Sequence, residues 1–201
     1  MKLYHSPRSR SVRPRWLLEE LGVPYELIRL DFSQNQQKST DYLKVHPHGA
    51  VPALVDGELT LFESAAICMH LADKFPDRKL APPIGTDARA LYYQWMVYSI
   101  ATLEPPFLQV FLHTVRLPEE QRSAGTVSEA RERFASVASV LTQALKSKPF
   151  LMGEQFSAAD IMIGSTLTWA QIMGLLAGQD ALQSYVARLS ERPAFQKANA
   201  D

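Results

Sequence analysis

Two short segments of the chain, Val51-Pro52 and Glu63-Ser64, carry residue types that can hold a small peptide. Pro52 stands at the entrance of a short apolar strand, where it cannot donate to a ladder, so it indicates a tight turn and is compatible with a cis bond. A cis bond would turn the backbone N–H and C=O of Val51 outward, free to pair with an extended ligand. Ser64, next to Glu63, begins a helix, and the N–H groups of a helix N-terminus favour a carboxylate. Together the two segments predict a site for a small peptide with a free α-carboxylate.

The order of these motifs resembles that of the cytosolic-type glutathione S-transferases, in a serine-type, bacterial-like form. The matching segments are Met1–Tyr4, Ser6–Arg13, Trp16–Glu26, Val51-Pro52, Glu63-Ser64 and Phe156–Ile161. They span nearly the whole chain in the expected order, and the Val-Pro and Glu-Ser motifs are specific as a pair. The resemblance implies that glutathione is the co-substrate.

A hydroxyl near the N-terminus is the expected activator of the glutathione thiol. Little of a free thiol is thiolate at neutral pH, and a hydroxyl donor or a helix N-terminus near the sulfur stabilises the anion. Ser9 follows the first strand and precedes the first helix, and in similar serine-type families the hydroxyl occupies this position. Ser11 could reach the same space. Tyr4 is the main competitor, although it lies inside the strand and favours a buried aromatic role. His5 could also reach the mouth of the site and perturb the thiol, although a polar residue at a strand end is more often solvated, and solvation is the expectation for it.

The resemblance also implies which residues hold glutathione. Glu63 would pair with the α-amino group and Ser64 would take the α-carboxylate of the γ-glutamyl end. Val51, held by Pro52, would make two antiparallel backbone bonds to the cysteinyl unit. Gln37 and Lys38 would face the glycyl carboxylate.

Composition limits the function classes. The 201 residues carry 21 Lys+Arg and 21 Asp+Glu, so no overall field favours nucleic acid or an acidic membrane. The single cysteine, Cys68, excludes an internal disulfide framework and suits a reducing compartment; it is expected in the core. No apolar run is long enough to span a membrane, and no cluster has metal-ligand spacing. The chain is therefore expected to be cytoplasmic, with no metal, nucleic-acid or membrane partner.

The first part of the chain mixes strands and helices. Strands are expected at 2–5 and 25–30 and in a hairpin with the Asp56-Gly57 turn signal. Helices are expected at 10–21, 39–45 and 63–75. This order matches a thioredoxin-like domain over 1–77, followed by a linker at 78–85.

The remainder, 86–201, is expected to be an all-helical bundle, so the fold class is an α+β thioredoxin-like domain followed by an all-α domain. A helix from Thr86 or Asp87 would be kinked or ended at Pro105-Pro106. Further helices are expected at 128–146, from 161 and at 180–189, with Ser157 and Asp160 forming a purely structural cap. Trp95, Ser99 and Leu103 recur at helical spacing as candidates for an electrophile pocket. The resemblance implies a homodimer.

The sequence thus predicts a detoxifying glutathione S-transferase that transfers the thiolate to small hydrophobic electrophiles; peroxidase, dehalogenase and isomerase chemistry stay open. Two alternatives use the same fold. One is a non-catalytic glutathione-binding ligand carrier, and the other is an interaction module that keeps only the fold. Retention on a glutathione matrix separates the interaction module from the other two. Turnover of an electrophile separates the enzyme from the carrier.

Overall fold

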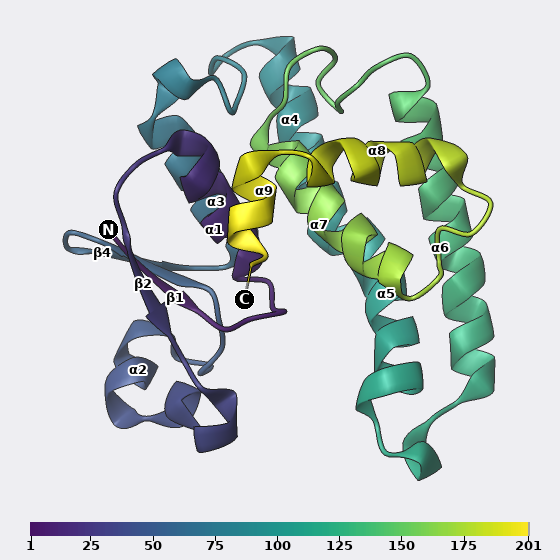
Figure 1. The fold of residues 1–201 in the computed structure, drawn as a ribbon, viewed down its shortest axis with the longest axis horizontal. Coiled ribbons are helices and arrows are strands. Elements are labelled where there is room, and N and C mark those ends of the chain that lie inside the picture. Colours follow the sequence, from purple (N-terminus) through teal and green to yellow (C-terminus); the bar gives the residue numbers. More distant parts are fainter. Residues whose placement is uncertain (201) are drawn as a thin grey trace. The chain divides into compact units, whose positions relative to one another are not determined.

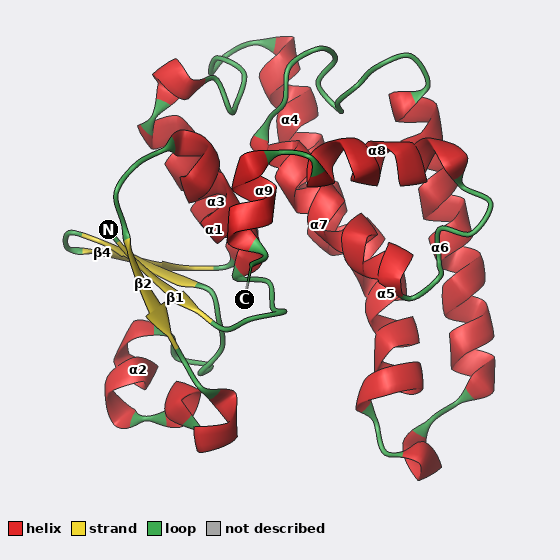
Figure 2. Cartoon of the chain, viewed as in Figure 1, coloured by secondary structure: helices red, strands yellow, loops and turns green. Residues whose placement is uncertain are grey.

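The computed structural model describes residues 1–200, in which the chain folds into two compact packing units. The first comprises 1–81 and 190–200, and the second 82–189. Figure 1 traces the chain through both, and Figure 2 shows that strands occur in the first unit while the second is built from helices and loops. The fold is therefore the predicted thioredoxin-like domain joined to a helical domain.

The first unit contains a four-stranded sheet in the order β2-β1-β3-β4. Its strands are β1 (Lys2–His5), β2 (Glu26–Arg29), β3 (Ala53–Asp56) and β4 (Leu59–Phe62). The β1–β2 pair is parallel and the other pairs are antiparallel. Gly57 has φ +63°, as the tight β3–β4 turn requires, so the predicted hairpin is confirmed.

Helices cover both faces of this sheet. Leu3 and His5 are buried, whereas the ring of Tyr4, between them in the strand, contacts Tyr42 at 5.1 Å between centroids. Since neighbouring strand residues face opposite ways, Tyr4 faces α2 (Thr40–Val45), and the opposite face is left to α1 (Val12–Leu21) and α3 (Ser64–Lys74). Short turns η1 (Phe32–Gln34), η2 (Gln36–Lys38) and η3 (Pro76–Arg78) complete the unit before residue 81.

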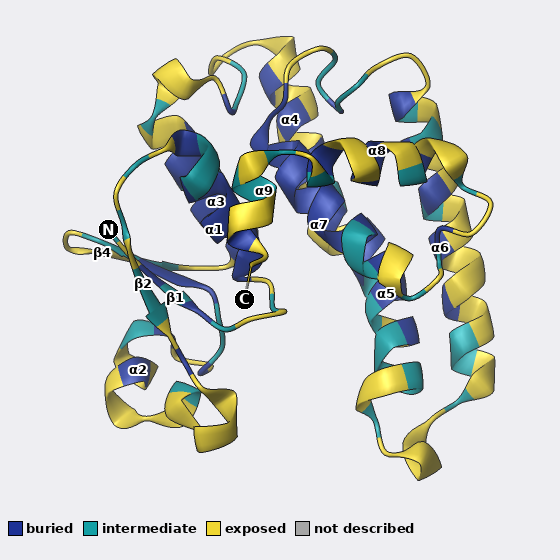
Figure 3. Ribbon diagram, in the orientation of Figure 1, coloured by how far each residue is buried: buried dark blue, intermediate teal, exposed yellow. Residues whose placement is uncertain are grey.

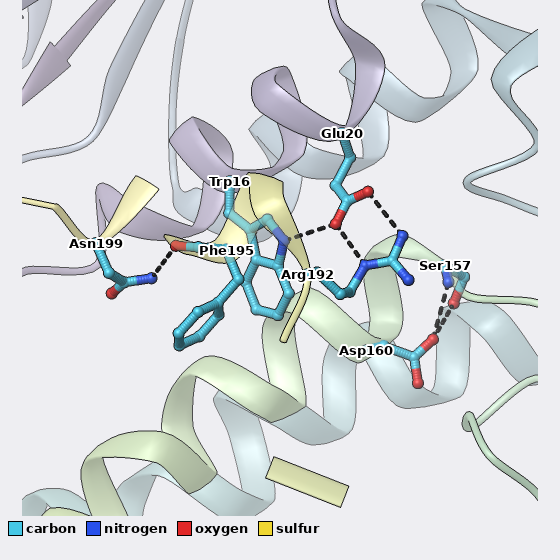
Figure 4. A network of polar contacts seen from close by, with 7 residues as sticks. All are labelled: Trp16, Glu20, Ser157, Asp160, Arg192, Phe195 and Asn199. Carbon is cyan, nitrogen blue, oxygen red and sulfur yellow. Dashed lines mark hydrogen bonds and ion pairs between the residues drawn. The ribbon is translucent and has the colours of Figure 1, made fainter. Parts of the chain in front are cut away.

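The end of the chain returns to the first unit. The last helix expected from the sequence is the one at 180–189, but Pro193 opens a further helix, α9 (Pro193–Ala198), where its missing N–H costs nothing. Arg192 donates two hydrogen bonds to Glu20, at 2.6 and 2.8 Å, and Glu20 also accepts from the Trp16 indole at 2.9 Å (Figure 4). The ring of Phe195 stands edge-on against Trp16. These contacts fasten α9 to α1.

The second unit is a set of packed helices with one unexpected feature. Its helices are α4 (Asp87–Tyr98), α5 (Glu104–Phe111), α6 (Ala124–Leu145), α7 (Ala158–Ile172) and α8 (Asp180–Ser190), which ends at the unit boundary. Thr86 caps α4, as expected, and α7 is buried from Ala158 to Leu167, whereas its C-terminal end is exposed (Figure 3). Pro105 and Pro106 do not end the helical path. A π-helical turn, η4 (Ser99–Leu103), leads directly into α5, whose first turn takes both prolines.

Two further differences from the expected elements have local causes. The helix expected at 128–146 begins four residues earlier, since Ser123 accepts the Thr126 N–H and caps it. A π-helical turn, η5 (Leu112–Arg116), and a short 3-10 turn, η6 (Glu119–Gln121), connect α5 to α6. Among the described residues, no helix is long and apolar enough to cross a membrane.

Candidate functional site

The loop between β1 and α1 places Ser9 at the start of the first helix. The Ser9 carbonyl accepts the Val12 N–H at 3.1 Å, and its hydroxyl accepts the Ser11 N–H at 3.2 Å. The same hydroxyl donates to the Ser6 carbonyl at 2.6 Å and lies 2.6 Å from the Ser11 Oγ. Ser9 is only partly buried, so its side chain is both held by the loop and within reach of a ligand.

Ser11 lies deeper than Ser9. It is fully buried, and its hydroxyl contacts the Ser9 Oγ, the His5 Nδ1 at 2.8 Å, the Ser6 carbonyl at 3.1 Å and the Ser6 N–H at 3.2 Å. Its hydroxyl makes no cap bond to α1. The geometry gives Ser11 a supporting place behind Ser9 rather than a place at the surface.

The expectation that His5 is solvated is wrong. His5 is 1 % exposed, because as the last residue of β1 it points to the face covered by α1. Its Nε2 lies 3.4 Å from the Arg15 Nη1. Tyr4, in contrast, points to the α2 face of the sheet.

The Val51-Pro52 peptide bond is cis, which agrees with the expected turn. Strand pairing of β3 begins at Ala53, so Val51 lies just outside the ladder, and it is only partly buried. The preceding carbonyl, that of Ala50, accepts the Tyr42 hydroxyl at 2.5 Å. This turn is thereby fixed to α2.

Glu63 and Ser64 form the junction between β4 and α3. Glu63 has φ +74°, a left-handed conformation that is unfavourable for a residue with a side chain and typical of ligand sites. Glu63 is exposed, whereas Ser64 is 3 % exposed and opens the helix. The side chains of the pair therefore point to different environments.

The Ser64 hydroxyl is held by Arg13, which donates to it at 3.2 Å from α1. Arg13 is fully buried, so a positive charge lies inside the protein directly beside the N-terminus of α3. Charge and helix dipole both favour an anion there. The contact with Ser64 was not predicted from the sequence, although the position of Arg13 is visible there: it precedes the buried Trp16 and Leu17 by three and four residues, which places it on their face of the helix.

Gln37 and Lys38 lie in η2, against the turn that leads to Val51. Lys38 is exposed and donates to the His48 carbonyl at 3.0 Å, and Gln37 is partly buried. In the same turn, His46 is buried, and burial lowers its pKa below the usual value for histidine. Gly49 is buried with φ +59°, and a Cβ added there would lie 2.4 Å from the Gln37 carbonyl. Only glycine allows η2 to approach this closely.

Replacing Gly49 by alanine is expected to displace η2 from the turn. We expect Gly49→Ala to lower the free energy of unfolding by about 2–4 kcal/mol, through the positive φ and the backbone clash together. Gly57→Ala is the matched control, because its φ is +63° but nothing lies within 4 Å of the added Cβ. Chemical denaturation measures the loss of unfolding free energy in each variant, and the difference between the two losses is the contribution of the clash with the Gln37 carbonyl. Equal losses in the two variants would show that the close approach to Gln37 has no energetic importance.

An open cavity of about 570 Å³ lies beside the Ser9 loop within the first unit. It is lined by residues of the β1–α1 loop and of the segment after β2: Ser6, Pro7, Arg8, Arg29, Leu30, Asp31, Phe32, Ser33 and Gln36. Phe32 is exposed and supplies an apolar surface, while Arg8 and Arg29 supply positive charge. Six of these nine residues are polar or charged, so the lining is mixed, with apolar side chains only at Pro7, Leu30 and Phe32.

The residues predicted to line an electrophile pocket are buried, and so is the single cysteine. Trp95, Ser99 and Leu103 are all buried in the helical unit, and the Ser99 hydroxyl donates to the Met96 carbonyl. Cys68 is fully buried as expected, and burial raises the pKa of its thiol to about 12. Within residues 1–200, no group of three His, Cys, Asp or Glu side chains is arranged to hold a metal ion.

Two family models together match most of the chain. Residues 1–73 match the family model of the glutathione S-transferase N-terminal domain, and residues 103–193 match that of the C-terminal domain. The chain is 31 % identical to glutathione S-transferase GstA of Escherichia coli O157:H7, over 98 % of this chain and 96 % of that protein. Among solved structures, it resembles BphK, a bacterial GST in a ternary complex, with a TM-score of 0.87 and 32 % identity over 100 % of this chain and 98 % of that one. A sphingomonad glutathione S-transferase complexed with glutathione has the same TM-score, with 30 % identity and the same coverage.

Proposed function

The chain belongs to the glutathione S-transferase family, and we propose that it uses Ser9 to activate glutathione for attack on small hydrophobic electrophiles. The observation that carries this proposal is the position of Ser9. Ser9 is partly exposed in the loop just before α1, in the same unit as Val51-Pro52 and Glu63-Ser64. The alternative of a non-catalytic carrier or interaction module is not favoured, because the relatives matched over nearly the whole chain include transferases.

Glutathione is proposed to lie along the first unit. Glu63 would pair with its α-amino group, and Ser64, backed by the Arg13 charge, would take the α-carboxylate. The Val51 backbone next to Pro52 would pair with the cysteinyl unit. Gln37 and Lys38 would face the glycyl carboxylate, since η2 lies against the same turn.

Ser9 then acts on the sulfur. Its hydroxyl proton, which is donated to the Ser6 carbonyl in the structure, would turn toward the sulfur and stabilise the thiolate. The thiol proton passes to solvent. The sulfur lone pair forms a new bond to the electrophilic carbon while the leaving group departs with its bonding electrons, or while an activated double bond takes up the pair. Fixing the sulfur beside the acceptor supplies a further rate gain.

The cavity beside the Ser9 loop suits the acceptor of this reaction. Its wall includes Pro7, Leu30 and Phe32, which favour an apolar electrophile. The buried positions of Trp95, Ser99 and Leu103 support packing within the helical unit, so we assign the acceptor to the cavity in the first unit instead. Detoxification in the cytoplasm is the role we propose for such a reaction.

A homodimer is proposed as the working form. Leu91, Tyr93 and Val97 are large apolar residues that α4 leaves between 43 % and 55 % exposed. Tyr93 and Val97, four positions apart, lie on one face of α4, which α3 of a second copy, around Ala65 to Phe75, would cover, whereas Leu91 lies on another side of the helix. Sedimentation of the purified chain tests this assignment.

The binding half of the proposal is tested with Ser64→Ala. We expect its Kd for glutathione to rise about 10–100-fold, because a hydrogen bond to the ligand's charged carboxylate is lost. Ser165→Ala is the control, since Ser165 is also a buried helical serine but lies in the second unit and donates to the Ile161 carbonyl. Isothermal titration of glutathione measures both. Unchanged affinity in Ser64→Ala would remove Ser64 from the site, and absence of binding by the unaltered chain would refute the proposed function.

A further inference from the structure

A continuous chain of polar contacts leads from the interior of the first unit to Ser9. The Arg15 Nη1 lies 3.4 Å from the His5 Nε2, the His5 Nδ1 lies 2.8 Å from the Ser11 Oγ, and the Ser11 Oγ lies 2.6 Å from the Ser9 Oγ. Arg15, His5 and Ser11 are 7 %, 1 % and 0 % exposed. This series of hydrogen-bonded groups is therefore enclosed by the protein and reaches solvent only at Ser9.

The chemistry of the groups fixes which is donor and which is acceptor in each of these hydrogen bonds. A guanidinium can only donate, so the His5 Nε2 that faces it must accept. The ring is then neutral, with its proton on Nδ1, and it donates to the Ser11 Oγ. Arg15 thus selects the tautomer of His5.

The hydrogen bonds that Ser11 accepts also fix the direction of its own hydrogen bond to Ser9. Its oxygen accepts from the His5 Nδ1–H and from the Ser6 N–H, which occupies both of its lone pairs. Its own proton then points either to the Ser9 Oγ at 2.6 Å or to the Ser6 carbonyl at 3.1 Å. The shorter contact is the one to Ser9. Ser9 consequently accepts from Ser11, and its own proton is the one that is left to donate.

We propose that His5 is a positioning residue for the reaction, acting through Ser11 to make the Ser9 hydroxyl a one-way and strengthened donor to the glutathione sulfur. The inference rests on the proposed role of Ser9. Hydrogen bonds in a chain polarise one another, and a hydroxyl that accepts a hydrogen bond donates more strongly. Without the donor at Nδ1, the Ser11 proton is free to turn away, and Ser9 can turn its own proton back toward Ser11.

The test compares two substitutions of His5 that differ in the donor at Nδ1. His5→Leu removes it, whereas the amide of His5→Asn can place an N–H near the same position. We expect His5→Leu to lower kcat about 5-fold and to raise the pKa of bound glutathione, with Kd for glutathione unchanged. His5→Asn is expected to keep most of kcat and to leave the pKa of bound glutathione close to that of the unaltered protein. Thiolate absorbance against pH and steady-state turnover of an aryl halide are the measurements.

Two controls separate the possible failures. Leu21→Ala removes a fully buried side chain from α1 and reports what loss of stability alone does to kcat. Ser9→Ala, measured alongside, tests the proposed function itself. If Ser9→Ala raises the pKa of the bound thiol while His5→Leu leaves it unchanged, the role of His5 is refuted and that of Ser9 stands. Equal losses in His5→Leu and His5→Asn, matched by Leu21→Ala, would reduce His5 to a packing residue.

Discussion

Replacing Ser9 by alanine is expected to lower kcat/KM for an aryl electrophile about 100-fold, because a preorganised donor to the developing thiolate is lost. The pKa of bound glutathione should rise toward the value of the free thiol, while Kd for glutathione changes little, since the peptide is held elsewhere. Stopped-flow turnover and thiolate absorbance against pH measure the two effects.

Ser9→Thr is the matched variant, because it keeps the hydroxyl and adds one methyl group. It should keep most of the thiol activation, which separates loss of the donor from disturbance of the loop. Thiolate formation that is unaffected in Ser9→Ala would contradict the assignment. Tyr4 would then be the next hydroxyl to test, since Ser11 is buried behind Ser9.

Replacing Asp160 by asparagine is expected to lower the free energy of unfolding by about 3 kcal/mol, a change of roughly 6–12 °C in Tm. One oxygen of this fully buried carboxyl accepts from the Leu151 N–H and the Tyr185 hydroxyl, and the other from the N–H and hydroxyl of Ser157. Figure 4 shows the contacts with Ser157. An amide placed either way would set its NH₂ group against donors, so no rotation of the side chain restores the network.

Asp180→Asn is the control for Asp160→Asn. Asp180 also lies in the first turn of a helix, α8, but it is exposed. It should lose no more than about 0.5–1 kcal/mol, the worth of a charge near a helix N-terminus. Thermal unfolding followed by circular dichroism compares the two. Similar Tm values for the two variants would show that the buried cap does not stabilise the helical unit.

Local patterns were sufficient for much of the fold. The Asp56-Gly57 turn, the capping pair Ser157 and Asp160 and the Thr86 cap depend on residues within a few positions of one another, so the sequence predicts them correctly. Proline was harder to interpret. Pro105, Pro106 and Pro193 fall in the first turns of helices, where a missing N–H is tolerated, and the same residue type would end a helix a few positions later.

The sequence by itself determined the family, the order of strands and helices up to about residue 75 and the positions of Val51-Pro52 and Glu63-Ser64, because each follows from short-range residue order. Only the tertiary structure decided which polar residues are buried together. Arg13 reaches Ser64 across 51 positions, and Arg192 reaches Glu20 across 172. Likewise His5, which a strand end would leave in water, is enclosed by α1 and joined to Ser9 through Ser11. Such pairings depend on how helices pack over a sheet, and the packing brings together residues whose separation in the sequence carries no periodic signal.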